Sequence, residues 1–466
     1  MDSIADIRRF GAEPGGSRDA SAAIAGALEY LKSKGGGTLL VPEGIFLCGP
    51  IELPSDTTLY LDTGACLRFS NDFSSYPPVE SRWEGISCWA MHPLVFARNA
   101  RNVAIRGEGT LDGQGAAWWA AHKRKKAERQ AGPETEAELR LAALNGGTAD
   151  QPSGGGGRET QFLRPPLVQF LSCDRVVVEG VSLVNSPFWT LHPVFTSRLR
   201  VENVSISNPP DAPNTDGIDI DSCSEVTISG CLVDVGDDCI ALKSGSGPGG
   251  VALAKPTRDV EIRRCTFLNG HGGVVIGSET AGGVENLEVA DCRFLGSDRG
   301  VRMKSRRGRG GTVQNLVFRN LVMDSVLAPI TLNMYYNCGS KRDEAGKLFS
   351  LDALIADELT PRFRNIIISN LVATRCRASA GFIVGLPESK VENLSLENCL
   401  IELAVSPDSP VESSEMYQGL PAPEGRGLRL RNAECTMKGV KVLGAGLEPN
   451  AQGILEEEGC LLSFLA

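Results

Sequence analysis

The sequence predicts an all-β protein built as a parallel β-helix, a solenoid of about ten coils with a helix capping its N-terminal end. One β-strand pattern recurs along the chain at similar spacings, and helical periodicity is confined to a few short stretches. Acidic and basic residues also recur at positions about one coil apart. A solenoid explains all three observations, because stacked coils bring equivalent positions of successive repeats to one side.

Each repeat is a polar residue, then alternating β-branched and apolar residues, then a small residue or Cys. Examples are "RVVVEGVSLVNS", "RLRVENVSISNP" and "EVTISGCLVDVG", which begin at Arg175, Arg198 and Glu225. Most neighbouring repeats are separated by between 23 residues, as from Arg175 to Arg198, and 34 residues, as from Glu225 to Asp259. Propeller blades need longer units, and leucine-rich repeats need Leu at fixed positions. The spacing therefore favours β-helix coils, stacked at roughly 4.8 Å.

An end coil needs a cap, because it would otherwise expose unpaired strand edges. The stretch "DASAAIAGALEYLKSK", residues 19–34, has the pattern of an amphipathic helix, with Asp19 as its N-cap and "GGG" after its end. We expect this helix to be the cap.

The repeats are interrupted by long segments, two of which we interpret as insertions, at residues 120–162 and 337–362. The first contains a charged helical piece, and a Pro/Ser-rich loop covers about 405–427. Insertions into solenoids commonly decorate the binding face. We therefore predict a single β-helix domain over residues 1–466 that carries these loops.

The composition is that of a globular protein, with 42% apolar and 22% charged residues, and no run of about 18 apolar residues indicates a membrane span. The formal net charge of −10 disfavours nucleic acid and anionic lipid as partners. The N-terminal sequence lacks the features of a secretory signal, so we expect a cytoplasmic location. The sequence gives no indication of oligomeric state.

The chain has fourteen cysteines, of which Cys231, Cys265, Cys292 and Cys399 occupy the same position of the repeat. We expect these four to be buried, stacked and reduced. No CxxC pair is present, so zinc and thioredoxin-like sites have little support.

Two short motifs place acidic residues about one coil apart. "NTDG" contains Asn214 and Asp216, and "GDD" contains Asp237 and Asp238, where Gly236 permits the chain to turn. If the β-helix prediction is right, these carboxyl groups converge. Neighbouring carboxyl groups raise one another's pKa, so that one can stay protonated while the others are ionised.

Two further motifs extend the series by about one coil each. "GHG" contains His271, and "RMK" contains Arg302 and Lys304, two residues that leave the same side of one strand. The basic pair favours an anionic ligand, because a guanidinium can bind a carboxylate through two parallel hydrogen bonds. A general acid to protonate the departing oxygen and a general base to activate water are what glycoside hydrolysis needs. The cationic cluster would bind an acidic sugar.

Structural roles explain other polar residues more simply. We interpret Asp219, Asp221 and Asp234 as turn residues at strand ends. We assign His92, His122 and His192 to structural roles, and we expect the run containing Arg306, Arg307 and Arg309 to be partly solvated. Trp83, Trp118, Trp119 and Trp189 could stack on sugar rings, but packing between coils is the favoured reading.

The four motifs resemble, in order and spacing, the signature of glycoside hydrolase family 28, the polygalacturonases. Similar stretches extend over most of the chain, from "FGAEPGG" through "SPFWTLHP" to "NMYY". The resemblance implies a right-handed parallel β-helix and an inverting hydrolase of α-1,4-galacturonosyl links that needs no cofactor. One departure from the family pattern is Met303, where Ile is usual, and an inward side chain there affects packing only.

The resemblance also implies roles for individual residues. Asp237 would be the general acid, Asp216 and Asp238 would activate water, and His271 would support the acid. Arg302 and Lys304 would bind the galacturonate carboxylate, with Asn214 beside them in the substrate site. A tyrosine after the basic strand would lie near the sugar, and either Tyr335 or Tyr336 fits that position.

Other functions remain open at this stage. A calcium-dependent pectate lyase is also a parallel β-helix with clustered aspartates, and a rhamnogalacturonan-type hydrolase or a non-catalytic sugar-binding β-helix would share the fold. The two insertions favour exo action on a galacturonate-containing oligo- or polysaccharide, because they could wall off one end of the groove.

Overall fold

A computed structural model describes residues 3–128, 132–147, 155–337, 339, 344–412, 416–444 and 453–465. Contacts between Cα atoms divide the chain into two compact units, Met1–Asp237 and Asp238–Ala466, which we call the first and second units. The prediction of a single domain over residues 1–466 stays a prediction. Parts of both predicted insertions lie outside the described residues.

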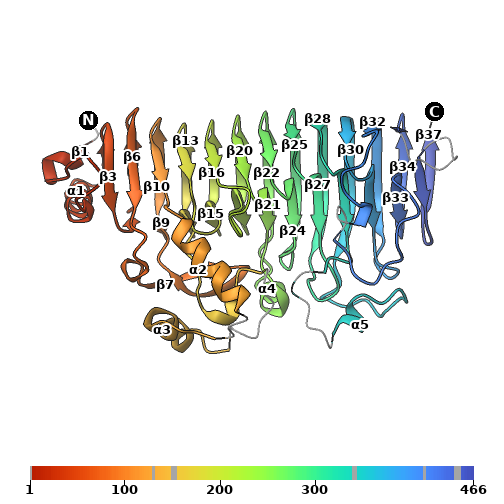
Figure 1. Ribbon diagram of the computed structural model, residues 1–466, viewed down its shortest axis with the longest axis horizontal. Helices are drawn as coiled ribbons and strands as arrows, with labels where there is room; N and C mark the ends of the chain where they lie inside the picture. Colours follow the sequence, from red (N-terminus) through yellow and green to blue (C-terminus); the bar gives the residue numbers. More distant parts are fainter. Residues whose placement is uncertain are drawn as a thin grey trace. The chain divides into compact units, whose positions relative to one another are not determined.

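The first unit contains two parallel sheets, A and B, together with one antiparallel hairpin (Figure 1). Sheet A is formed by β1 (Ile4–Asp6), β2 (Gly37–Val41), β3 (Gly44–Cys48), β5 (Thr57–Leu61), β6 (Ala65–Phe69), β10 (Arg101–Gly107), β11 (Thr110–Asp112), β13 (Asp174–Glu179), β14 (Ser182–Val184), β16 (Ser197–Glu202), β17 (Ser205–Ser207), β19 (Ser224–Ser229) and β20 (Leu232–Val235). Sheet B is formed by β4 (Ile51–Glu52), β9 (Val95–Arg98), β12 (Val168–Leu171), β15 (Leu191–Val194) and β18 (Ile218–Asp221), and the hairpin by β7 (Pro78–Trp83) and β8 (Ile86–Met91).

Each strand pairs in parallel with the strand one coil further along the chain. Val176 of β13 lies opposite Leu199 of β16, which lies opposite Val226 of β19. All three side chains are buried, whereas their neighbours in sequence are intermediate or exposed. The alternating apolar and other residues of each repeat therefore point in turn into the core and toward the surface of a β-helix.

The second unit repeats this arrangement. Its sheet A strands are β22 (Thr257–Arg263), β23 (Thr266–Asn269), β25 (Val284–Ala290), β26 (Arg293–Leu295), β28 (Thr312–Asp324), β30 (Arg362–Cys376), β32 (Val391–Leu403), β34 (Ala433–Lys438), β35 (Lys441–Leu443) and β37 (Leu461–Leu465). Its sheet B strands are β21 (Asp238–Lys243), β24 (Gly272–Gly277), β27 (Arg299–Lys304), β29 (Ala328–Asn333), β31 (Gly381–Val384), β33 (Leu428–Arg431) and β36 (Ile454–Glu456). The fold is a parallel β-helix, as predicted.

The polar residue that opens each repeat forms a ladder in the second unit. Asn393 donates from Nδ2 to Oδ1 of Asn365, Asn365 to Asn315, Asn315 to Asn286, and Asn286 to Asp259, over 2.9–3.2 Å. All five residues have a left-handed backbone, with φ between 49° and 59°. Asn and Asp tolerate this conformation better than other non-glycine residues, which explains why they recur at this position of the repeat.

The four cysteines that share a position of the repeat are buried, as predicted. Cys231, Cys265, Cys292 and Cys399 are 1–2% exposed and are not in disulfide bonds, and Cys399 lies opposite Leu371 of the preceding coil rather than another cysteine. They occupy the core as small apolar residues.

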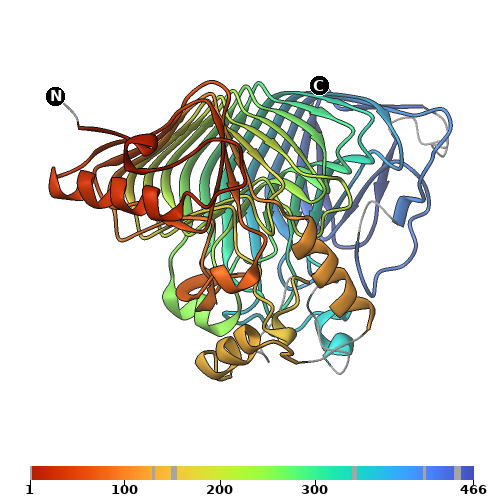
Figure 2. The ribbon, with the colours of Figure 1, turned by 60° about the vertical axis from the view of Figure 1, so that its left-hand side comes forward.

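The N-terminal helix α1 (Ser21–Ser33) lies beside the first strands of the first unit (Figure 2). It buries Ala23, Ile24, Ala27 and Leu31, which recur on one face of the helix. The predicted N-cap Asp19 is displaced by one residue, since Ala20 occupies the N-cap position. Asp19 instead accepts a hydrogen bond of 2.8 Å from the backbone N–H of Ser21.

The predicted insertion at 120–162 contributes two helices to the first unit, α2 (Ala116–Ala127) and α3 (Glu136–Leu144). Thr135 and Glu138 form a capping box at the start of α3. The remaining helical elements are η1 (Ile7–Phe10), η2 (Phe73–Ser75), η3 (Arg158–Thr160), α4 (Gly247–Leu253) and α5 (Ala345–Leu348). Within the described ranges, every helix is too short or too polar to cross a membrane.

Candidate active site

In the first unit, Asp216 and Asp237 approach one another closely. Asp216 lies just before β18 and Asp237 just after β20, and each has a carboxylate oxygen within 4.8 Å of one on the other. Asp216 is 3% exposed, and its carbonyl accepts a hydrogen bond of 2.9 Å from the N–H of Thr190. A Cβ on Gly236 would lie 2.6 Å from the carbonyl oxygen of Pro210, so a close backbone approach accounts for the glycine before Asp237.

Asn214 is held by a buried arginine that the sequence analysis did not select. Arg164 donates from Nη2 to Oδ1 of Asn214 over 2.8 Å, and from Nη1 to the carbonyl oxygens of Pro187 and Pro213. Its one signal in the sequence is that it is the single charged residue of the mostly apolar stretch "FLRPPLVQF". The guanidinium of Arg164 therefore fixes the segment at residues 213–214 that leads to Asp216.

The outward face of sheet B in the first unit is covered by the β7–β8 hairpin and by the segment 155–164. Arg82 of β7 forms a buried ion pair with Asp221 of β18, at 2.6 Å. Trp83 donates from Nε1 to the carbonyl oxygen of Arg164 over 3.1 Å, and its ring stacks on Phe188 at a centroid distance of 4.8 Å. These contacts place a packed layer over β12, β15 and β18.

In this layer, the interpretation of two aspartates from the sequence is wrong, and that of the tryptophans agrees with the structure. Asp219 and Asp221 are not turn residues, because both are fully buried within β18, and Asp221 neutralises Arg82. Trp83, Trp118 and Trp189 are 0–3% exposed, in agreement with the packing role favoured from the sequence. The interpretation of Asp221 was wrong because no local pattern indicates that Arg82, from a hairpin far away in the chain, is its partner.

In the second unit, the basic strand β27 binds Asp238, the first residue of β21. Arg302 donates from Nη1 to Oδ1 of Asp238 over 2.9 Å, and Lys304 donates from Nζ to Oδ2 of the same carboxylate. All three side chains are buried. Burial opposes ionisation of Asp238, but Lys304, Arg302 and Lys243 outweigh it and hold the pKa of that carboxyl well below its usual range. Asp238 is therefore a permanent carboxylate at neutral pH.

His271 lies directly before β24 and is exposed. Gly272 lies opposite Asp238 in the parallel register of β24 and β21, so His271 sits one coil away from the start of β21. Its backbone carbonyl accepts a long hydrogen bond of 3.4 Å from Nη1 of Arg299. The structure thus places His271 at the same edge of sheet B as Asp238, as the spacing of the motifs predicts.

The two tyrosines after the basic strand have different surroundings. The ring centroid of Tyr336 lies 5.7 Å from the Arg302 guanidinium and 5.5 Å from Nζ of Lys304. Tyr335 is fully buried and donates its hydroxyl to the carbonyl oxygen of Ser350 over 3.2 Å. Of the two predicted substrate-binding tyrosines, Tyr336 faces the basic cluster, and Tyr335 packs against the second insertion instead.

Residues 416–421, from the predicted loop at 405–427, cover sheet B beside the basic strand. Sδ of Met416 accepts a hydrogen bond of 3.2 Å from Nη2 of Arg302, and its carbonyl accepts one from Nδ2 of Asn333. Tyr417 stacks on Phe382 of β31 with centroids 5.8 Å apart and ring planes 9° apart. Because Phe382 lies two coils beyond Arg302 in the register, this segment closes the outward face of the sheet at that end of the basic cluster.

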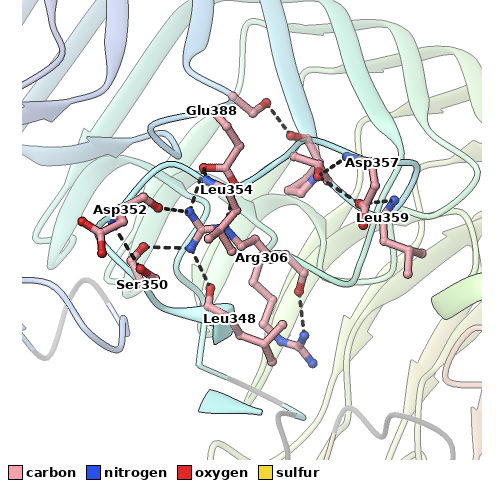
Figure 3. A network of polar contacts seen from close by, with 12 residues as sticks. Arg306, Leu348, Ser350, Asp352, Leu354, Asp357, Leu359 and Glu388 are labelled. Carbon is pink, nitrogen blue, oxygen red and sulfur yellow. Dashed lines mark hydrogen bonds and ion pairs between the residues drawn. The ribbon is translucent and has the colours of Figure 1, made fainter. Parts of the chain in front are cut away.

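A second network fixes the insertion at 337–362 to the coil after the basic strand (Figure 3). Arg307 forms a two-pronged ion pair with Glu388, at 2.6 and 2.8 Å, and donates to the carbonyl oxygens of Leu348, Ser350 and Asp352. The expectation that the arginine run is partly solvated is wrong, since Arg306, Arg307 and Arg309 are 1–5% exposed. Carbonyl groups of the insertion accept hydrogen bonds from Arg306 and Arg307. The hydroxyl of Ser246 accepts one from Arg309, and the repeat pattern of the sequence marks none of these acceptors.

Comparisons with known proteins agree with the fold and the motifs. A family model described as "Glycosyl hydrolases family 28" matches residues 142–350. A probable polygalacturonase of Vitis vinifera is 29% identical over 379 residues, which cover 80% of this chain and 68% of that protein. An endo-polygalacturonase of Pectobacterium carotovorum subsp. carotovorum is 28% identical over 341 residues, covering 70% of this chain and 73% of that protein.

A solved structure gives a match over nearly the whole chain. The crystal structure of a hyperthermoactive exopolygalacturonase from Thermotoga maritima superposes with a TM-score of 0.77 and 30% sequence identity, covering 95% of this chain and 92% of that one. The four motifs, between residues 214 and 304, lie within the range 142–350 that the family model matches. The chain is therefore a glycoside hydrolase and belongs to family 28, the family of the polygalacturonases.

Proposed function

We propose that this enzyme hydrolyses α-1,4-galacturonosyl links of oligogalacturonides with inversion, removing units from the chain end. Asp237 protonates the departing oxygen, and Asp216 and Asp238 activate the attacking water. His271 supports the acid, while Arg302, Lys304 and Tyr336 bind the galacturonate, with Asn214 beside them. The activity of the relatives supports the substrate class, since they are polygalacturonases.

The observation that carries the acid and base assignment is the contrast between the carboxylates. Asp238 is held ionised by two cations, so it is suited to act as a base and unsuited to donate a proton. Asp216 and Asp237 lie within 4.8 Å of each other, and two carboxyl groups this close favour a state in which one proton is retained. Asp237 is more exposed than Asp216, which favours Asp237 as the group that meets the glycosidic oxygen.

The separation of Asp216 and Asp237 is short for an inverting pair, for which about 6.5–9.5 Å is usual. The stereochemistry therefore needs its own measurement. Proton NMR of the first product released from a trigalacturonide should show the β-anomer before mutarotation. An α-anomer as the first product contradicts inversion.

Exo action is supported by the covering segments in each unit. In the second unit, residues 416–421 close sheet B beside Arg302. In the first unit, the hairpin layer closes sheet B over β12, β15 and β18. Both covers leave less open strand surface for a long polysaccharide than bare coils would.

A digestion of tetragalacturonide tests the proposal. Monogalacturonate should appear first and trigalacturonide with it, and a burst of digalacturonide alone contradicts exo action. Asp237→Asn should abolish turnover with a nearly unchanged Tm, and full activity in that variant contradicts the assignment. Saturated products, formed undiminished in the presence of a chelator, separate this hydrolase from a calcium-dependent lyase.

A further inference from the structure

Arg164 is a buried cation in the first unit whose direct acceptors are neutral. It is 0% exposed and makes three hydrogen bonds, to the carbonyl oxygens of Pro187 and Pro213 and to Oδ1 of Asn214, over 2.8–3.0 Å. Its guanidinium also lies 5.0 Å from the centroid of the Phe188 ring. Among the residues that the structure describes, no carboxylate forms an ion pair with it.

Burying a charged group without a paired counter-charge costs several kcal/mol. Burial lowers the pKa of Arg164 to about 9, while the charges of Glu84, Asp216 and Asp237 act in the opposite direction. Electrostatic interaction is mutual, so a cation that these carboxylates stabilise must stabilise their ionised forms in turn. Arg164 therefore acts on Asp216 and Asp237 through its charge.

We infer that Arg164 is a positioning residue of the hydrolytic site: it fixes the turn at residues 213–214 that presents Asp216, and its charge favours ionisation of one carboxyl of the Asp216–Asp237 pair. This inference rests on the proposed function. Arg164 reaches the reacting groups through Asn214 and through its field, and it has no direct contact with the proposed proton donor.

Two further titratable groups interact with Arg164, and neither is expected to account for a shift in the pH dependence of kcat/KM. Glu84, at the hairpin turn, lies 3.8 Å from Nη2 of Arg158, a second fully buried guanidinium. His122 of α2 interacts with the charge of Arg164, and burial, Arg164 and Lys126 lower its pKa to about 3. His122 is thus neutral over the range in which the enzyme is assayed.

Two variants separate geometry from charge. Arg164→Met removes both, so kcat should fall on the order of 100-fold with KM for trigalacturonide little changed. Removing a positive charge raises the pKa values of nearby carboxyl groups. Both the acidic and the basic limb of the plot of kcat/KM against pH should therefore shift to higher pH by about one unit. Arg164→Lys keeps the charge but not the three-way hydrogen bonding; its profile should stay in place while kcat falls.

Arg158→Met is the matched control. Arg158 is equally buried, donates to the carbonyl of Trp83 over 2.7 Å and lies 5.3 Å from the Trp83 ring centroid. Its pH profile should not move. Unshifted limbs in Arg164→Met, or a shift equal to that of Arg158→Met, overturn the inference.

If Arg164→Met does not fold, the test rests on Arg164→Lys. A reduced kcat with the kcat/KM pH profile unchanged supports the inference, and a wild-type kcat overturns it. Asp237→Asn is measured in parallel. Turnover retained in that variant overturns the proposed function together with this inference. If Asp237→Asn loses turnover but the kcat/KM pH profile of Arg164→Met does not shift, this inference alone is overturned.

Discussion

Arg302 donates a hydrogen bond of 2.9 Å to the carboxylate of Asp238, a residue 64 positions earlier in the chain. The same guanidinium lies beside the ring of Tyr336 and the sulfur of Met416. Burial opposes ionisation of Asp238, but Lys304 and Arg302 outweigh it and hold the pKa of that carboxyl well below its usual range. Arg302 therefore helps to keep Asp238 ionised, which is the state that its proposed role as a base requires.

Loss of Arg302 should weaken the binding of anionic substrates selectively. Arg302→Ala should raise KM for trigalacturonide about 10-fold or more, because a charge-assisted contact is lost, and have less effect on a neutral oligosaccharide. Steady-state kinetics on both substrates measure the difference. Arg319→Ala, which removes a half-exposed ion pair with Glu288, is the control and should change neither KM. Equal effects of Arg302→Ala on both substrates would argue against a carboxylate clamp.

Glu279 should make stability depend on acid pH. Although burial opposes its ionisation, Lys243, Arg309 and Lys304 lower its pKa to about 2. A depressed carboxyl pKa stabilises the fold above the unfolded-state value of about 4.5, and this contribution is lost as the pH falls toward 2. The contribution at neutral pH is about 3 kcal/mol.

The measurement is the Tm of wild type and Glu279→Gln as a function of pH. The Tm difference between the two should be large at pH 7 and should shrink steadily between pH 4.5 and pH 2.5. Glu288→Gln, which alters a half-exposed carboxylate, should show a small difference at all pH values. A constant difference for Glu279→Gln would mean that the ionised carboxylate is not the stabilising group.

The Arg307–Glu388 pair should hold the second insertion in place. Removing one member leaves the other charge buried, so Arg307→Met and Glu388→Leu should each destabilise the protein by about 3 kcal/mol. The double variant should recover part of that loss, since it leaves no charge unpaired. Thermal unfolding and limited proteolysis of residues 344–354 report the two effects.

An exposed pair provides the comparison for that prediction. Arg375 and Asp324 form an ion pair on the surface, with side chains 67% and 28% exposed. Arg375→Ala should therefore cost at most about 1 kcal/mol. Similar losses for Arg307→Met and Arg375→Ala would show that the insertion does not depend on the buried pair.

Tyr417 should influence the length of the products. Tyr417→Ala removes the ring that stacks on Phe382 and loosens residues 416–421, so longer chains should gain access past Arg302. The ratio of internal to terminal cleavage on a reducing-end-labelled hexagalacturonide should rise several-fold. Tyr60→Ala, a half-exposed ring on β5, is the control. An unchanged product pattern in Tyr417→Ala would remove the main support for a closed end in the second unit.

The coils and the motifs were predictable because both are periodic. The polar residue at each coil start, including Asn286 and Asn315, signals a left-handed corner, and Arg302 and Lys304 share a strand face because their spacing is two. The choice between Tyr335 and Tyr336 was not predictable, since it depends on where Ser350 of an insertion lies.

Long-range contacts from residues outside the repeats account for most of what the sequence analysis missed. Arg82 pairs with Asp221 across 139 residues of chain, and Arg164 reaches Asn214 across 50 residues, and neither pair shares a repeat position. No local pattern marks such partners. The aspartates within β18 were consequently interpreted as turn residues, and Arg164 was not selected as a candidate.

The asparagine ladder has a consequence for how such enzymes diversify. Asn365 bonds to Asn315 over 3.1 Å although 50 residues separate them, and Asn315 bonds to Asn286 over 3.2 Å across only 29. The extra length bulges out at another corner and leaves the rung geometry untouched. Evolution can therefore lengthen, shorten or exchange loops around the proposed site without redesigning the scaffold, and an engineer can graft loops between relatives on the same basis.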